Sequence, residues 1–229
     1  MTKQTTARAA GFIYLLVVLT GIFNLMYVPK QLIVFSDAAA TISNLTGNEL
    51  LFRSGIAAGV LCYVFFLILP FILFDLFKEV NKKVAVFMVV LAASSVPISL
   101  FNMVTKLDML SLISGAEYLN TFSAEQIEAK VMLLLHSYNN GIRVVQIFWG
   151  LWLFPFGYLA YKSGYTPKVL GISLMLGCFG YLIYFFARIV FPETSIPSFV
   201  GWPASFGEIG TCLWLLIMGV KDKSIKAKY

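Results

Sequence analysis

Long apolar segments alternate with short polar ones along the whole chain. Runs of about 20 mostly apolar residues occur six times, at about residues 9–28, 53–77, 84–105, 129–161, 169–191 and 203–220. Runs of this length predict helices that cross a membrane, because strands of a membrane barrel need only about ten residues and alternate in polarity. We therefore expect an all-α polytopic membrane protein, a bundle of six transmembrane helices that forms a single transmembrane domain over residues 1–229.

The composition agrees with this interpretation. Of the residues, 59% are hydrophobic and 12% are charged, whereas soluble domains carry about 25% charged residues. The first apolar run follows Lys3 and Arg8, as in a secretory signal, but it is longer than a typical signal core and lacks a small-residue cleavage site. We expect it to be a retained helix.

The basic residues are distributed unequally between the two ends of the predicted spans. The side that carries the termini holds Lys3, Arg8, Lys78, Lys82, Lys83, Lys162, Lys168, Lys221, Lys223, Lys226 and Lys228, and the opposite side holds Lys30, Arg53, Lys106, Lys130 and Arg188. The positive-inside rule then predicts that both termini are cytoplasmic. This bias accounts for most of the formal charge of +6 without a nucleic-acid partner, and the basic C-terminal segment is expected to meet anionic membrane lipids.

The fourth run contains an unusual polar segment, HSYNNGIRVVQIFWG. Its residues His136, Asn139, Asn140 and Arg143 have the spacing i, i+3, i+4 and i+7, so they share one helical face, which Gln146 continues. Lipid cannot satisfy these groups, so we expect the face to meet protein or a wet cavity. The opposite face carries Val144, Val145, Phe148 and Trp152.

If Arg143 lies within the membrane, the free-energy cost of its insertion must be offset by an interaction with another group. Insertion of a central arginine costs about 2.5–3.5 kcal/mol. Glu208 is the only acid of the last run, and at a rise of 1.5 Å per residue both residues come out roughly 4 Å from the midplane. We expect an ion pair between Arg143 and Glu208; the pattern leaves open whether it only joins two helices or serves a site.

Other polar residues favour a cavity in the outer half of the bundle, the half in which Arg143 and Glu208 are expected. They include Asn24, Arg53, Tyr181 and a helically spaced stripe formed by Ser95, Ser99, Asn102 and Lys106. Cations exceed acids in this outer half, which favours the binding, or the transport, of a small anionic ligand or a lipid headgroup. The alternative is that Arg53, Lys106 and Arg188 merely snorkel to headgroups. The candidate ligand-binding residues are Arg143, Glu208, His136, Asn139, Asn140, Gln146, Asn102, Lys106, Tyr184 and Arg188.

Catalytic and metal chemistry have little support in the sequence. A single histidine excludes haem ligation by two histidines and multi-histidine zinc sites, so we expect no cofactor, no metal site and no catalytic residue. Two other classes stay open beside ligand binding. One is an intramembrane enzyme that uses His136 and Glu208 as an acid–base pair. The other is a non-catalytic assembly or regulatory subunit whose polar face docks a helix of an unknown protein partner.

Local signals complete the expected architecture. Residues 36–51 suit a short amphipathic helix, and Thr121 or Ser123 suits the N-cap of the fourth span. Gly55 and Gly59 form a GxxxG pattern, which is typical of close helix packing. Kinks are expected where proline interrupts a span, at Pro70, Pro97 and Pro155.

Three blocks of the chain carry a resemblance to a known family. They read ARAAGFIYLLVVLTGIFN, HSYNNGIRVVQIFWGLWLFPFGYLAYKSG and PASFGEIGTCLWLLIMGVK. Together they resemble the bacterial membrane-protein family catalogued as domain of unknown function 4386. The resemblance implies a six-helix fold and a multi-pass protein of the bacterial inner membrane, and it implies no particular ligand or activity.

Overall fold

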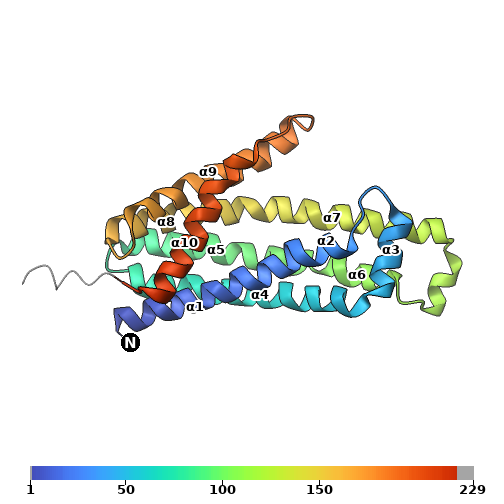
Figure 1. Ribbon diagram of the computed structural model, residues 1–229, viewed down its shortest axis with the longest axis horizontal. Coiled ribbons are helices and arrows are strands. Elements are labelled where there is room, and N and C mark those ends of the chain that lie inside the picture. Colours follow the sequence, from blue (N-terminus) through green and yellow to red (C-terminus); the bar gives the residue numbers. More distant parts are fainter. Residues whose placement is uncertain (1, 221–229) are drawn as a thin grey trace, which may run out of the picture. The chain divides into compact units, whose positions relative to one another are not determined.

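A computed structural model of the protein describes residues 2–220, and every regular element in that range is helical (Figure 1). Six segments are long and apolar enough to cross a membrane: Lys3–Leu32, Glu49–Phe77, Lys82–Leu112, Ala124–Ser163, Lys168–Val190 and Ser198–Ile217. The predicted all-α architecture with six spans is confirmed. The predicted contact of the basic segment 221–228 with lipid concerns residues outside the described range.

The first span is interrupted near its end by a π-helical turn. It consists of α1 (Lys3–Ile22), the π segment η1 (Phe23–Tyr27) and α2 (Val28–Leu32). Pro29, at the start of α2, has no backbone N–H, and its ring would clash with the carbonyl of Leu25 in a regular α-helix. The wider π turn relieves this conflict and adds a residue to the turn, which changes the direction in which Asn24 points.

The next two elements confirm two local predictions. Helix α3 (Ala38–Gly47) lies within the predicted segment 36–51, and the Asp37 side chain caps it by accepting a hydrogen bond from the Ala40 N–H at 2.8 Å. The second span is α4 (Glu49–Phe77). Its GxxxG residues allow close packing: a Cβ at Gly55 would lie 2.9 Å from Val28, and one at Gly59 would lie 2.8 Å from Asn24.

The third and fourth spans extend further than their apolar runs. The third consists of α5 (Lys82–Asn102) and α6 (Val104–Leu112), and the short helix η2 (Glu117–Thr121) follows it. The fourth consists of α7 (Ala124–Leu151) and α8 (Leu153–Ser163). Ser123 is the cap of α7, because its Oγ accepts from the Gln126 N–H at 3.3 Å while the Gln126 side chain accepts from the Ser123 N–H at 2.9 Å.

Proline and glycine determine where the helices α7 and α8 end. The Pro155 ring would clash with the carbonyl of Leu151, the residue at which α7 ends. Gly164, with φ of +67°, ends α8. Helices α9 (Lys168–Val190) and α10 (Trp202–Ile217), with η3 (Ser198–Gly201) before α10, complete the fold. Helix α9 packs against both α8 and α10 (Figure 1).

The chain divides into two compact units, which we describe separately. Unit 1 comprises Met1–Leu16, Phe65–Val96 and Val144–Tyr229, and unit 2 comprises Val17–Val64 and Pro97–Arg143. The core of unit 1 is aromatic: the buried Trp152 ring stacks on Phe156 at 5.0 Å and meets Phe66 edge-on at 5.2 Å. Unit 2 contains parts of the first four spans together with α3 and α6. The single transmembrane domain stays a prediction.

Candidate functional site

Unit 2 contains a buried lysine. Lys106, on α6, is 4% exposed, and its ammonium Nζ donates a hydrogen bond to the Asn24 Oδ1 at 2.7 Å. The same Nζ lies 4.3 Å from the centre of the Tyr138 ring, in cation–π geometry. The helix continues to Leu112, so Lys106 is not at a helix end, and its side chain packs inward. The snorkelling alternative therefore does not hold for Lys106.

The partner of Lys106 is positioned by the π turn and by a glycine. Asn24 is 1% exposed. Its side chain lies against Gly59 of α4, where any Cβ would come 2.8 Å from the Asn24 Nδ2. The Nδ2 is buried and has no hydrogen-bond partner among residues 2–220. A buried donor without a partner is costly, which makes this position a candidate contact for a ligand or for water.

A second asparagine ties α5 to α7 beside the lysine. The Nδ2 of buried Asn102 donates to the backbone carbonyl of Tyr138 at 2.9 Å. Gly141 leaves room for this amide, since a Cβ at that position would collide with the Asn102 side chain. The sequence NNGIR therefore places a glycine where α7 must accept Asn102, and this contact fixes the Tyr138 backbone next to the lysine.

This packing predicts the effect of a small change. Gly141→Ala is expected to lower the free energy of unfolding by about 1 kcal/mol, because overpacking costs about 1–3 kcal/mol and the gain in helix propensity offsets part of it. Gly47→Ala in α3 is the matched control, because nothing lies within 4 Å of its Cβ position. Thermal unfolding in detergent compares the two variants, and an equal response would contradict the assigned contact.

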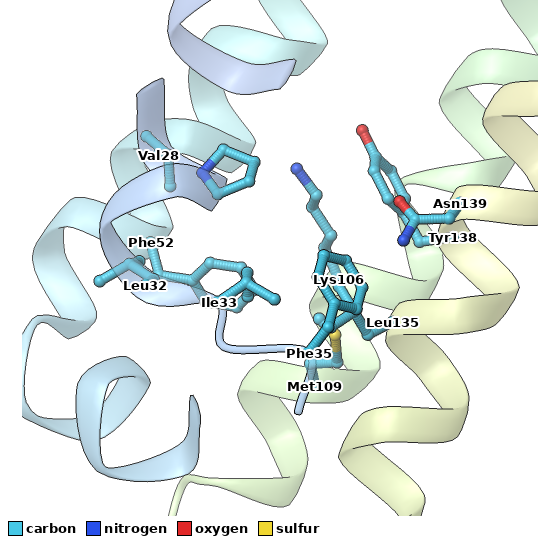
Figure 2. Close-up of a pocket in the computed structure, with 11 residues that line it drawn as sticks. Val28, Leu32, Ile33, Phe35, Phe52, Lys106, Met109, Leu135, Tyr138 and Asn139 are labelled. Atoms are coloured by element: carbon cyan, nitrogen blue, oxygen red, sulfur yellow. The ribbon is translucent and has the colours of Figure 1, made fainter. Parts of the chain in front are cut away.

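The lysine lines a small cavity within unit 2 (Figure 2). Its volume is about 40 Å³, which is room for a few waters or for the oxygens of a carboxylate or phosphate. Its lining is mostly apolar and consists of Val28, Pro29, Leu32, Ile33, Phe35, Phe52, Lys106, Met109, Leu135, Tyr138 and Asn139. In Figure 2 the Lys106 side chain extends between Val28 and Leu32 on one side and Tyr138 on the other.

One edge of the cavity is accessible. Phe35 is 55% exposed, and its ring centre lies 6.1 Å from that of the exposed His136. The loop that carries Phe35 is held by Thr41: the Val34 N–H donates to the Thr41 Oγ at 3.0 Å, and the Thr41 hydroxyl is 2.9 Å from the Val34 carbonyl. We assign Phe35 and His136 to the rim of the cavity.

Lys106 has no charged partner at the cavity. No acidic residue lines it. The ion pairs among residues 2–220 join Lys3 to Glu79, Arg53 to Glu49 and Lys78 to Asp75, so none of them includes Lys106. An ammonium has three donors, and Asn24 accepts from one. The arrangement can therefore offer donors to an anion in a mostly apolar site.

The predicted ligand-binding residues fall into different surroundings in unit 2. Lys106 and Asn139 line the cavity, and buried Asn102 lies one turn from Lys106. Arg143 is half-buried and donates to the Asn140 Oδ1 at 2.9 Å. His136 and Asn140 are exposed, and the buried face of α7 in this unit is that of Val131, Leu135 and Tyr138. His136 and Asn140 thus lie outside the buried core of this unit, and the contact of the polar face with protein or a wet cavity stays a prediction.

The other predicted residues belong to unit 1. Both oxygens of Glu208, on α10, accept hydrogen bonds from tyrosines: the Tyr14 hydroxyl at 3.3 Å and the Tyr181 hydroxyl at 3.4 Å. The Tyr184 hydroxyl is 3.3 Å from the Pro197 carbonyl oxygen. Gln146 is half-buried, and Arg188 is exposed near the end of α9. Because Arg143 and Glu208 lie in different units, with partners inside each, their ion pair stays a prediction.

Asn24, Tyr138 and Phe35 were not among the predicted ligand-binding residues, although the sequence places Asn24 among the polar groups of the expected cavity. Asn24 has a signal in the sequence, since Pro29 follows it five residues later and disturbs the helix at that point. Tyr138 follows Val131 and Leu135 at i+7 and i+3, so it continues a buried helical face. Phe35 lies in a loop, and no periodic pattern identifies it.

The fold and the site define a polytopic helical membrane protein with a buried lysine in one unit. Residues 9–219 match the family described as domain of unknown function (DUF4386), and the chain belongs to this family. It is also similar to an uncharacterized protein of Archaeoglobus fulgidus, with 39% identity over 75 residues, 33% of this chain and 44% of that protein. The match thus spans less than half of that relative. No solved structure matches the chain.

Proposed function

We propose that the protein binds a small anionic group, a carboxylate or a phosphate, in the Lys106 cavity of unit 2. The observation that carries this proposal is the buried ammonium, bonded to a neutral amide in a cavity without an acidic residue. A charge held away from water is costly unless it is paired. An anion that accepts a hydrogen bond from Lys106 in this cavity would supply this partner.

This proposal changes the roles expected from the sequence. Lys106 takes the place of Arg143 as the anchor of the anion, Asn139 is the lining amide that orients it, and Asn24 holds the Lys106 side chain. Glu208 belongs to a separate cluster with Tyr14 and Tyr181 in unit 1. His136 contributes at the rim through Phe35. The acid–base pair of His136, in unit 2, and Glu208, in unit 1, stays a prediction.

Thermal unfolding with added anions tests the proposal. Acetate and inorganic phosphate are titrated at constant ionic strength against the wild type, Lys106→Met and Lys30→Met. At a hundredfold excess over Kd, a ligand stabilises by about 2.7 kcal/mol, which raises the Tm of a chain of this size by about 5–10 °C. We expect that rise in the wild type and in Lys30→Met, whose lysine is exposed, but not in Lys106→Met.

Two outcomes would overturn the proposal. One is a wild type whose Tm responds to neither anion. The other is a Lys106→Met variant that keeps the full response, since the bound anion would then contact some other cation of the protein.

A further inference from the structure

We propose that the Lys106 cavity opens at the level of the lipid headgroups and takes its anion, a phosphate group carried by acyl chains, from the plane of the membrane. This inference rests on the proposed function, because it names the source of the anion that the same cavity would bind. Four sets of observations carry it: the charge-free runs of the first four spans, the lengths of the helices, the residues that surround the cavity and the polarity of its lining.

The first observation concerns the charges that bound each span. The longest run without Asp, Glu, Lys or Arg in each of the first four spans is bounded by Arg8 and Lys30, Arg53 and Asp75, Lys83 and Lys106, and Arg143 and Lys162. Each run is about 20 residues, which as a helix equals the hydrocarbon thickness of about 30 Å. Because consecutive spans cross in opposite directions, the cations of unit 2 mark one membrane boundary: Lys30, Arg53, Lys106 and Arg143.

The second observation is that the helices are longer than a membrane is thick. The segment Ala124–Ser163 has 40 residues, which corresponds to about 60 Å, twice the hydrocarbon core. Since its uncharged run begins after Arg143, the preceding part of α7 projects beyond the hydrocarbon. This accounts for the exposure of His136 and Asn140, which meet headgroups and water there. Arg143 accordingly lies at the boundary and not near the midplane.

The third observation is that the cavity coincides with this boundary on every helix that forms it. Pro29 precedes Lys30 and Phe52 precedes Arg53, while Lys106 is itself a boundary residue. On α7, Asn139 lies one turn before Arg143. Lipid phosphates occupy this level of a membrane. Exposed apolar side chains nearby, with Phe35 at 55% and Leu50 at 81% exposure, suit the same interfacial layer.

The fourth observation concerns the size and polarity of the cavity. A volume of about 40 Å³ admits an anionic group and little more, so the rest of a ligand must lie outside, past Pro29, Ile33 and Phe35. A free phosphate would exchange its whole hydration shell for one lysine and one amide in a mostly apolar lining. An amphiphile keeps its chains in the hydrocarbon and places only its phosphate in the cavity, which the geometry favours.

Thiol accessibility tests the membrane level. Ser137 and Val144 are both exposed on α7, one before and one after Arg143. Ser137→Cys and Val144→Cys are placed in nanodiscs of neutral lipid and treated with a membrane-impermeant maleimide, with the wild type as the background for its buried cysteines. We expect Ser137→Cys to react at least tenfold faster, because lipid covers only the second position. Equal rates, fast or slow, would overturn the assigned boundary.

Binding measurements test the source of the anion and separate the two proposals. The ligands are dioctanoyl phosphatidate, dioctanoyl phosphatidylcholine and inorganic phosphate, and the proteins are the wild type, Lys106→Met and Lys30→Met. We expect phosphatidate to bind the wild type at least tenfold more tightly than inorganic phosphate or phosphatidylcholine. This binding is expected to be lost in Lys106→Met and retained in Lys30→Met.

The other outcomes are distinct. Equal affinities for phosphatidate and inorganic phosphate, both dependent on Lys106, would overturn the membrane source and leave the anion site intact. If neither phosphatidate nor inorganic phosphate binds the wild type, the anion site itself is overturned. Binding of both lipids with equal affinity in Lys106→Met would show adsorption of acyl chains and would overturn both proposals.

Discussion

Gly11→Ala is expected to lower the free energy of unfolding by about 2–3 kcal/mol, because its Cβ would meet backbone and not a movable side chain. Gly11 lies on α1 in unit 1, against α10. A Cβ at this position would come 2.6 Å from the Leu216 Cα and 2.8 Å from the Leu215 carbonyl carbon. The two helices would have to separate, which would also weaken the contact of the Cys212 Sγ with the Gly11 carbonyl at 3.6 Å.

The first span supplies a matched control for this change. Gly21→Ala introduces the same methyl group with the same gain in helix propensity, about 1 kcal/mol, but its nearest neighbour is the Cys62 Sγ at an ordinary 3.4 Å. We expect Gly21→Ala to be neutral or slightly stabilising. Unfolding in mixed micelles with increasing SDS, followed by tryptophan fluorescence, measures both variants. Equal losses would contradict the close approach of α1 and α10.

Much of the fold follows from hydropathy alone. Each predicted span has a helix in the structure, because a run of about 20 apolar residues is stable in lipid only when its backbone hydrogen bonds are internal. The cap at Ser123 could also be predicted, since the hydroxyl and Gln126 have the spacing of a capping box. These features depend on neighbouring residues, which the sequence displays directly.

Hydropathy alone does not predict the full lengths of the helices. The second span was expected at residues 53–77 and the third at 84–105, whereas the helices cover Glu49–Phe77 and Lys82–Leu112. Hydropathy identifies the part of a helix that suits lipid, but a helix that continues into the headgroup layer tolerates charge there. His136 and Asn140 of the polar face are exposed, and the contact of this face with protein or a wet cavity stays a prediction.

The helical periodicity of the sequence does not predict the contacts between side chains in the site. Lys106 and Asn102 were among the expected residues because they share a helical stripe, but their partners are on other helices. The π turn at Phe23–Tyr27 adds a residue to one turn and rotates everything before it relative to everything after it. A pattern of 3.6 residues therefore does not give the face of Asn24 relative to Val28 and Leu32. Only the packed structure places its amide on Lys106.

Asn24→Asp is expected to weaken anion binding at least a hundredfold while the protein stays folded. The substitution preserves shape, and its Oδ1 can still accept the hydrogen bond that Lys106 now donates to Asn24 at 2.7 Å. The new carboxylate would neutralise the ammonium and repel an incoming anion. At an effective dielectric of about 20, two like charges about 5 Å apart repel by about 3 kcal/mol, which corresponds to about a hundredfold in affinity.

This variant separates a ligand site from a lysine that only serves packing. If Lys106 has a purely structural role, Asn24→Asp gives it a charged partner, and any response of the wild type to phosphate or acetate should persist. If the cavity is an anion site, the variant should unfold at the same or a higher Tm without added anions and lose the rise in Tm that they cause. Asn120→Asp is the control for charge alone, because Asn120 is exposed on η2 of the same unit and contacts neither Lys106 nor the cavity. An anion affinity reduced equally in both variants would contradict the assignment, since the general charge of unit 2, and not the partner of Lys106, would then govern binding.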